Sequence, residues 1–380
     1  MNSLKKLLPY ISILFLLGAG SVHAIEIDDP IQALIKKAKT GDNVSAFKYA
    51  ERLQRGLPGE APNFELAAHW YKIAAQQGNA EAALVLAELY ETEKVTPPSP
   101  NAVKEMYEFG YRLLKADADR GRPSAATKLG LMFFHGQGVK EDANRAIKWL
   151  QRGVELGSAQ AKVALGRLTI WNSTPGYNAE QSLEMLHEAA EAGQGSAWLH
   201  IGLAYSGAFG GRVNHPRALE AFEKAHKSGT TAEGTRQYGM AYISGLGVVK
   251  DETRGAELIR EAAERGNSEA MYNLALLYRN GVGVEKSKSQ EIAWFKKASD
   301  YKVPDADYYL AIAYRDGVGV TKSKEKALNY FKRAQIKKHV LAIRDYNELA
   351  GLNKPKAAAV KKDAQKPAEQ EPVDDELEME

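Results

Sequence analysis

Apolar and polar positions along the chain follow the pattern of paired amphipathic helices. The segment 268–302 shows it most clearly, because its first half repeats apolar residues at the spacing of one helical face. A glycine-rich turn follows, and then a second apolar face. The positions are Ala270, Leu274, Ala275 and Tyr278 on the first face, Gly281-Val282-Gly283-Val284 in the turn, and Ala293, Trp294, Phe295 and Ala298 on the second face. The segment therefore predicts helix, turn, helix.

The same pattern recurs at an almost constant interval. In segment 305–338 the first-helix and turn positions are shifted by 36 residues. Glycines that end successive segments lie 36 or 37 residues apart after a first gap of 43, at Gly78, Gly121, Gly157, Gly193, Gly229 and Gly266. Lys302 and Lys338 take the equivalent places in the last two segments. A period of this length predicts a chain of stacked repeats, about eight in number over residues 43–339.

Glycines inside the first helices predict how the helices pack. Gly130, Gly166, Gly202 and Gly239 are spaced at the repeat interval, and Ala275 and Ala311 continue the series. A glycine within a helix costs about 1 kcal/mol relative to alanine. Such a cost in four successive repeats indicates that a neighbouring helix approaches closely there. We therefore expect an all-α fold of antiparallel helix pairs, each pair stacked on the next.

Three segments depart from the repeat. Prolines at 97, 98 and 100 belong to an insertion, and residues 171–176 and 206–211 replace the usual turn with different sequences. Asn178 and Gln181 have the spacing of a capping box, which predicts the start of a helix after the second departure.

The two ends of the chain differ from the repeats. Residues 1–24 carry Lys5 and Lys6, an apolar run and Val22-His23-Ala24, the three parts of a secretory signal cleaved after Ala24. An uncleaved anchor is the alternative. Residues 25–42 and 340–352 are expected to be capping helices. Residues 353–380 hold five lysines and eight acids, and this composition predicts a disordered tail. Its acidic run at 374–380 is either a solvating end or a docking segment for a basic partner.

Together, the motifs A-x3-L-G-x2-Y, G-x-G-V and A-x2-W-[YF]-x2-A-A-x2-G resemble the Sel1-like repeat family, a relative of the tetratricopeptide repeat. Segments 123–157 and 267–302 match them best. The resemblance implies a right-handed α-solenoid that binds other proteins. It also implies a scaffold, regulator or host-interaction factor of the bacterial cell envelope. Export and the absence of cysteine, hence of a lipid-anchored cysteine, predict a periplasmic or secreted protein.

If the solenoid faces the way tetratricopeptide repeats do, three columns of first-helix residues line its concave face. The candidate partner-binding residues there are Arg167, Arg236, Met240, Tyr272, Arg279, Tyr308 and Arg315. Tyrosine and arginine are enriched at binding hot spots. The competing interpretation is that the tyrosines pack between repeats and the arginines are only solvated.

The chain carries no motif that indicates an enzyme or a cofactor site. The G-x-G-V turns join helix to helix at the repeat phase, so we interpret them as structural turns and not as phosphate-binding loops. The histidines lack metal-ligand spacing, and a formal charge of +3 is too small to indicate a nucleic-acid partner. We therefore expect a non-catalytic protein with protein partners, no cofactor and no metal. The alternatives are an effector exported beyond the envelope and, with no nucleophile to support it, a cell-wall hydrolase.

Overall fold

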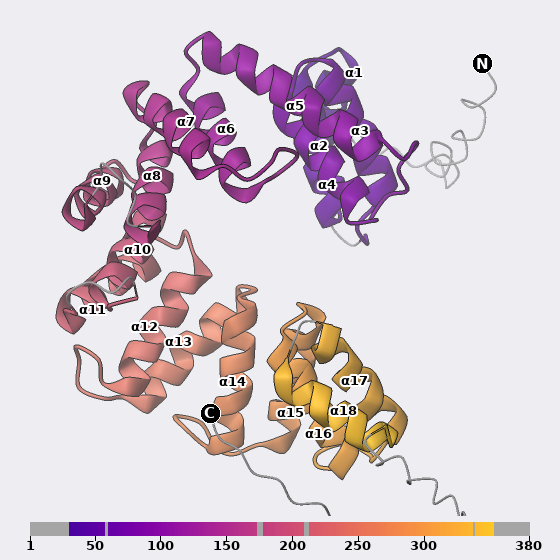
Figure 1. Cartoon of the computed structure of the whole chain (residues 1–380), viewed down its shortest axis with the longest axis vertical. Coiled ribbons are helices and arrows are strands. Elements are labelled where there is room, and N and C mark those ends of the chain that lie inside the picture. Colours follow the sequence, from indigo (N-terminus) through magenta and orange to yellow (C-terminus); the bar gives the residue numbers. More distant parts are fainter. Residues whose placement is uncertain (1–29, 58–59, 173–177, 209–212, 337–338, 353–380) are drawn as a thin grey trace, which may run out of the picture. The chain divides into compact units, whose positions relative to one another are not determined.

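The structure is a computed structural model that describes residues 30–57, 60–172, 178–208, 213–336 and 339–352 (Figure 1). Within these ranges the chain is built from helices joined by turns and contains no strand, as the sequence predicts for an all-α fold. The chain divides into two compact units, residues 1–177 and 178–380. The predicted signal at 1–24 and the predicted tail at 353–380 lie outside the described residues.

In the first unit, each helix packs on the helix that follows it in the chain. Its helices are α1 (Pro30–Lys39), α2 (Asn43–Arg55), α3 (Phe64–Gln76), α4 (Ala80–Glu91), α5 (Ala102–Asp119), α6 (Pro123–His135), α7 (Ala143–Glu155) and α8 (Ala159–Asn172). Helix α1 falls in the range predicted for an N-terminal capping helix.

The second unit repeats this arrangement, and again each helix packs on the next. Its helices are α9 (Ala179–Glu191), α10 (Ser196–Tyr205), α11 (His215–Lys227), α12 (Ala232–Ser244), α13 (Glu252–Glu264), α14 (Ser268–Asn280), α15 (Lys288–Asp300), α16 (Pro304–Asp316), α17 (Lys324–Ile336) and α18 (Val340–Ala350). Helix α18 falls in the range predicted for a C-terminal cap.

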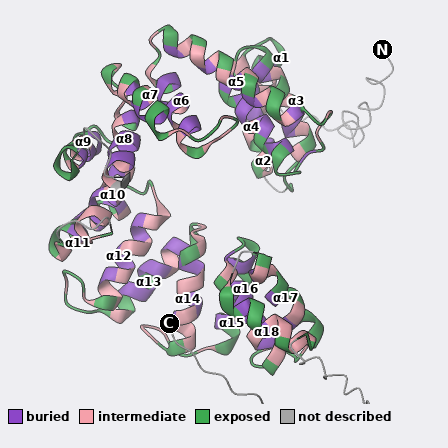
Figure 2. Ribbon diagram, viewed as in Figure 1, coloured by how far each residue is buried: buried purple, intermediate pink, exposed green. Residues whose placement is uncertain are grey.

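Small residues and single aromatic rings share the core of each helix pair. Ala275 and Ala298 are fully buried between α14 and α15, and Phe295 fills the space beside them with no exposed surface. Buried residues lie along the facing sides of the helices, and exposed residues lie on the turns and outer faces (Figure 2). Alanine lets the helix axes approach, and the aromatic ring supplies most of the buried apolar area.

The terminal glycine column has a conformational cause. Gly78, Gly157 and Gly266 have φ angles of 91°, 86° and 89°, in the left-handed region that side chains with a Cβ rarely adopt. Lys302 takes the same place with a φ of 64°, so this unit ends in the same turn without glycine. The predicted capping box is confirmed, because the Asn178 side chain accepts from the Gln181 backbone and the Gln181 side chain accepts from Asn178.

The glycines within the first helices mark close approaches, as predicted. A Cβ on Gly239 of α12 would lie 2.9 Å from the Gly255 carbonyl oxygen and 3.0 Å from Leu258 Cβ of α13. A Cβ on Gly202 of α10 would overlap the ring of Phe222 in α11. The approaching helix is in each case the second helix of the same pair.

Candidate protein-binding surface

From α12 onward, side chains link the first helix of each pair in the second unit to the first helix of the next. Asn267, the N-cap of α14, donates to Glu233 of α12 at 3.0 Å. The rings of Tyr272 in α14 and Tyr309 in α16 lie 6.2 Å apart, and Tyr308 of α16 donates to Asp345 of α18 at 3.1 Å. These four helices, α12, α14, α16 and α18, therefore form a continuous row, which we call the first-helix row.

At the α12 end of this row, the two predicted residues are held by neighbouring side chains. Arg236 donates through two nitrogens to the carboxylate of Glu233, at 2.6 and 2.8 Å, and its side chain is only 18% exposed. Burial opposes the charge of Glu233, but hydrogen bonds from Arg236, Gln237 and Asn267 outweigh it and lower the pKa of the carboxyl group. Met240 is half-buried, with its Sδ 3.8 Å from the Asn273 amide nitrogen.

The α14 residues lie in an aromatic cluster. Tyr272 packs against Phe295 at 5.9 Å and faces Tyr309. Burial is the main cause that raises the pKa of the Tyr272 phenol, and the nearby Tyr309 raises it further. The guanidinium of Arg279 lies over the Tyr309 ring at 4.6 Å and 3.9 Å from the carboxylate of Glu291. Glu291 is 7% exposed, whereas the Arg279 side chain is 35% exposed.

Tyr308 and Arg315 of α16 both contact the carboxylate of Asp345. Tyr308 is 9% exposed, and burial together with its hydrogen bond to Asp345 raises the pKa of its phenol. Arg315 lies 3.7 Å from the same carboxylate, and it also pairs with Asp316 at 2.8 Å. Asp345 is 7% exposed, whereas the Arg315 side chain is 37% exposed.

Arg167, the seventh predicted residue, belongs to the first unit. It lies in α8 with its guanidinium 5.2 Å from the ring centroid of Phe134 in α6, and burial lowers the pKa of the guanidinium. The structure thus brings six of the seven predicted residues together on one row and places the seventh on the corresponding helices of the other unit.

The tyrosines of the row pack between repeats, while Arg279 and Arg315 present about a third of their side chains to solvent. Each of these arginines has an almost fully buried carboxylate within 4 Å. A second contact limits the rotation of each guanidinium, since Arg279 lies over the Tyr309 ring and Arg315 donates to Asp316. A held guanidinium offers a planar set of donors to a carboxylate or a carbonyl group of a partner. This arrangement is suited to recognition rather than to proton transfer.

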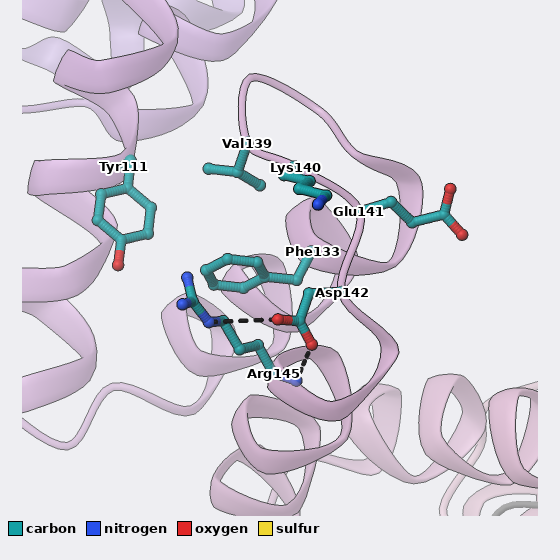
Figure 3. Close-up of a pocket in the computed structure, with 7 residues that line it drawn as sticks. All are labelled: Tyr111, Phe133, Val139, Lys140, Glu141, Asp142 and Arg145. Carbon is teal, nitrogen blue, oxygen red and sulfur yellow. Dashed lines mark hydrogen bonds and ion pairs between the residues drawn. The ribbon is translucent and has the colours of Figure 1, made fainter.

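The first unit contains a separate pocket of about 650 Å³ between α5, α6 and the start of α7 (Figure 3). Tyr111 of α5 meets Phe133 of α6 edge to face at 6.2 Å, and the guanidinium of Arg145 lies 5.5 Å from the Phe133 ring centroid. Asp142, the N-cap of α7, accepts from the Arg145 backbone at 2.9 Å and pairs with its side chain at 3.3 Å. Val139 and Lys140 line the loop side, whereas Glu141 points away (Figure 3).

Sequence reasoning missed this pocket. Arg145 over Phe133 repeats a contact found in other pairs, where Arg217 lies 5.5 Å from Tyr205 and Lys326 lies 5.3 Å from Tyr314. What distinguishes the pocket is Tyr111. The residue ten places before the terminal position is aliphatic in the other repeats: Ala68, Ile147, Leu183, Leu219, Ala256, Ile292 and Leu328. A comparison of that column would have singled out Tyr111.

Two properties of the described ranges bear on function. No group of histidine, aspartate and glutamate side chains within them has the arrangement needed to hold a metal ion. Of the helices described, none has both the length and the apolar character required to cross a membrane.

Comparison with known proteins identifies the repeat. The family model of the Sel1 repeat matches residues 43–79, 123–158, 159–194, 232–267, 268–300 and 304–334. An uncharacterised protein of Neisseria meningitidis serogroup B is 28% identical over 56% of this chain and 42% of its own length. A chitin synthase regulator of Malassezia restricta is 27% identical over 42% of this chain and 11% of its own length. The chain thus spans less than half the length of either relative.

A solved structure gives a match over most of the chain. The crystal structure of a Sel1 repeat protein from Oxalobacter formigenes is 25% identical, with a TM-score of 0.54. The match covers 84% of this chain and 90% of that protein.

Proposed function

Because the chain belongs to the Sel1 repeat family, a family whose repeats mediate protein–protein interaction, we propose that it is a non-catalytic scaffold of the bacterial cell envelope. Its partner binds on the first-helix row of the second unit. The observation that carries this proposal is the pair Arg279 and Arg315. Both lie at the same place in consecutive repeats, and each has a buried carboxylate within 4 Å and part of its surface open.

Preorganisation is the physical reason to choose these two residues over the tyrosines. Ordering a free arginine side chain at an interface costs about 0.5–1.5 kcal/mol, and Glu291 and Asp345 remove part of that cost before a partner arrives. Tyr308 has little surface left for a partner, since it is 9% exposed. Tyr272 and Tyr308 pack between repeats beneath the surface of the row, and Arg279 and Arg315 contact the partner.

The test is affinity capture from envelope extracts with residues 25–380 as bait. The row variant is Arg279→Ala with Arg315→Ala, which leaves both tyrosines in place. The matched control is Lys296→Ala with Lys332→Ala, two exposed cations on the second helices α15 and α17. We expect the partner to be lost from the row variant and retained by the control. If both variants retain the partner, the binding site lies outside the first-helix row.

The envelope location rests on the predicted signal at 1–24 and is tested separately. Fractionation into cytoplasm, periplasm and medium should place the chain in the periplasm, shortened by the 24 residues. A protein found mainly in the medium would favour the alternative role as an exported effector. Full-length protein retained in the cytoplasm would overturn the envelope proposal.

A further inference from the structure

The turns between the two helices of a pair carry a repeated feature in the second unit that the binding row does not use. Three of these turns begin with a glycine in the left-handed conformation that ends α12, α14 or α16. The next residue is aliphatic in each turn, and the residue five places after the glycine is a lysine. These residues are Leu246, Val282 and Val318, and Lys250, Lys286 and Lys322. We call the six residues the turn edge.

The turn edge exposes both apolar surface and positive charge. Leu246 and Val318 are 44% and 45% exposed, and the three lysines are exposed as well. Val282 is half-buried and packs against the core of its repeat. The lysine stems are held by the turns: a Cβ on Gly281 would lie 2.7 Å from Lys286 Cγ, and one on Gly317 would lie 3.1 Å from Lys322 Cβ. Lys250 pairs with Glu252 at 2.6 Å, whereas Lys286 and Lys322 have no ion pair with any residue in the described ranges.

The first unit does not share this feature. Its turn after α6 has the same glycines, but Gln137 and Glu141 take the aliphatic and lysine positions. The turn itself therefore does not require an aliphatic residue or a lysine at these places. Val282 also packs on the core of its repeat, but the exposed Leu246 and Val318 and the three lysines have no such structural role. A ligand that is both acidic and apolar would explain why these exposed residues recur in consecutive turns.

The chain contains a segment of that chemistry. Residues 374–380 read Asp-Asp-Glu-Leu-Glu-Met-Glu, with five acids around Leu377 and Met379. In an extended conformation, Leu377 and Met379 fall on one side and the three glutamates on the other. The apolar side can therefore contact the aliphatic residues of the turns while the carboxylates reach the long lysine side chains around them.

The position of α18 makes the contact possible within one molecule. His339 at the start of α18 lies 3.4 Å from Asp305 at the start of α16, and Asp345 farther along α18 contacts Arg315 near the end of α16. The two helices thus run parallel, and α18 ends on the side where the turn after α16 begins. As a random-coil linker, the 21 residues between Leu352 and Asp374 would have a root-mean-square span of about 25 Å. Neighbouring helices lie about 10 Å apart, so the turns of the last two repeats are within reach.

We propose that residues 374–380 dock on the turn edge of their own chain. The linker gives the segment an effective concentration in the millimolar range. A contact with a dissociation constant of about 1 mM is then occupied roughly half of the time. An acidic segment of another protein that binds the turn edge has to displace the tail first.

The test uses the absence of cysteine from the chain. Val318→Cys and Leu377→Cys introduce one thiol on the turn edge and one in the acidic run. The rate of disulfide formation is measured in dilute full-length protein with oxidised glutathione as the oxidant. We expect a disulfide within one chain, formed at least tenfold more slowly when Lys250, Lys286 and Lys322 are all changed to glutamate. High salt should slow its formation as well.

Two further variants keep the test decisive. Lys296, Lys302 and Lys332 are exposed at or near the C-terminal ends of second helices, and changing them to glutamate makes the same change in net charge away from the turns. This control should leave the rate unchanged. A second variant combines the three lysine-to-glutamate changes of the turn edge with a change of the five acids of 374–380 to lysine. The charges are then reversed on both sides, so the rate of disulfide formation should be restored. A rate insensitive to the turn-edge reversal, or disulfides mainly between two chains, would overturn the proposal.

Discussion

At Gly239, the missing side chain decides how closely α12 and α13 pack. The space that a Cβ would occupy is bounded by the Gly255 carbonyl oxygen and by Leu258 and Ile259, all within 3.1 Å. Backbone cannot move out of the way as a flexible side chain can. The repeat therefore keeps glycine here although glycine weakens the helix itself.

Replacing Gly239 by leucine should lower the free energy of unfolding by about 3 kcal/mol, because overpacking forces α12 and α13 apart. Urea denaturation followed by circular dichroism measures the change. Thr253→Leu, at an exposed position of α13, is the matched control and should change stability by less than about 0.5 kcal/mol. Equal stability of Gly239→Leu and the wild type would show that the close approach of α12 and α13 at Gly239 is not needed for stable packing.

Glu233 links two repeats through its carboxylate, and this contribution should depend on pH. The folded-state pKa of Glu233 lies below its ordinary value of 4.5, so the stabilisation is fully present above pH 4.5 and is lost as the pH falls through the folded pKa. Glu233→Gln should therefore cost about 2 kcal/mol at pH 7 and progressively less below pH 4.5. Denaturation curves at pH 7, 5 and 3.5 test this. A cost that stays constant over this range would mean that the charge of Glu233 contributes nothing.

The roles of single residues in the row could be predicted only in part. The spacing correctly indicated that Tyr272, Arg279, Tyr308 and Arg315 belong to one set of helices. It gave no information on Asp345 or Glu291, whose buried carboxylates decide which of these side chains stay open. Asp345 lies 37 residues from Tyr308 in the sequence, and nothing in the pattern identifies it as a partner. Long-range pairs of this kind follow from the stacking geometry.

At the scale of the element, α18 shows what holds a first helix in place without a second helix of its own in the described residues. Val340 and Leu341 are 76% and 45% exposed, so apolar packing secures only one side. Asp345 anchors the middle of α18 to Tyr308 and Arg315, and His339 anchors its N-terminal end. Its Nδ1 accepts from the Ala342 backbone at 3.1 Å, and its ring stacks on Tyr308 at 4.4 Å. A histidine N-cap replaces the asparagine, aspartate or serine used by most other helices of the unit.

Replacing His339 by alanine should destabilise α18 by about 1 kcal/mol, because the first turn loses its capping acceptor. Hydrogen exchange of amides 340–350 should then accelerate about fivefold, while amides of α14 serve as the internal reference. His339→Asn keeps a capping oxygen and should recover most of the protection. If His339→Ala and His339→Asn lose the same protection of amides 340–350, the stacking of the His339 ring on Tyr308 holds α18 and the capping hydrogen bond does not.

At the scale of the whole molecule, the period of the sequence was enough to predict paired helices and the family to which they belong. It also predicts one run of repeats over 43–339, which stays a prediction. The structure describes two compact units, residues 1–177 and 178–380. The sequence marked this place as a departure, since residues 171–176 lack the glycine–valine turn. Whether such a departure separates two units depends on contacts between helices far apart in the chain, and periodicity does not report these.

A hydrogen-exchange footprint of the captured partner on the intact chain tests the proposed binding row without changing any residue. Binding on the first-helix row predicts protection of backbone amides in α12, α14 and α16, with the strongest effect around Arg279 and Arg315. The second helices α13, α15 and α17 should exchange as they do in the free protein. Protection confined to these second helices, or to the first unit, would contradict the account.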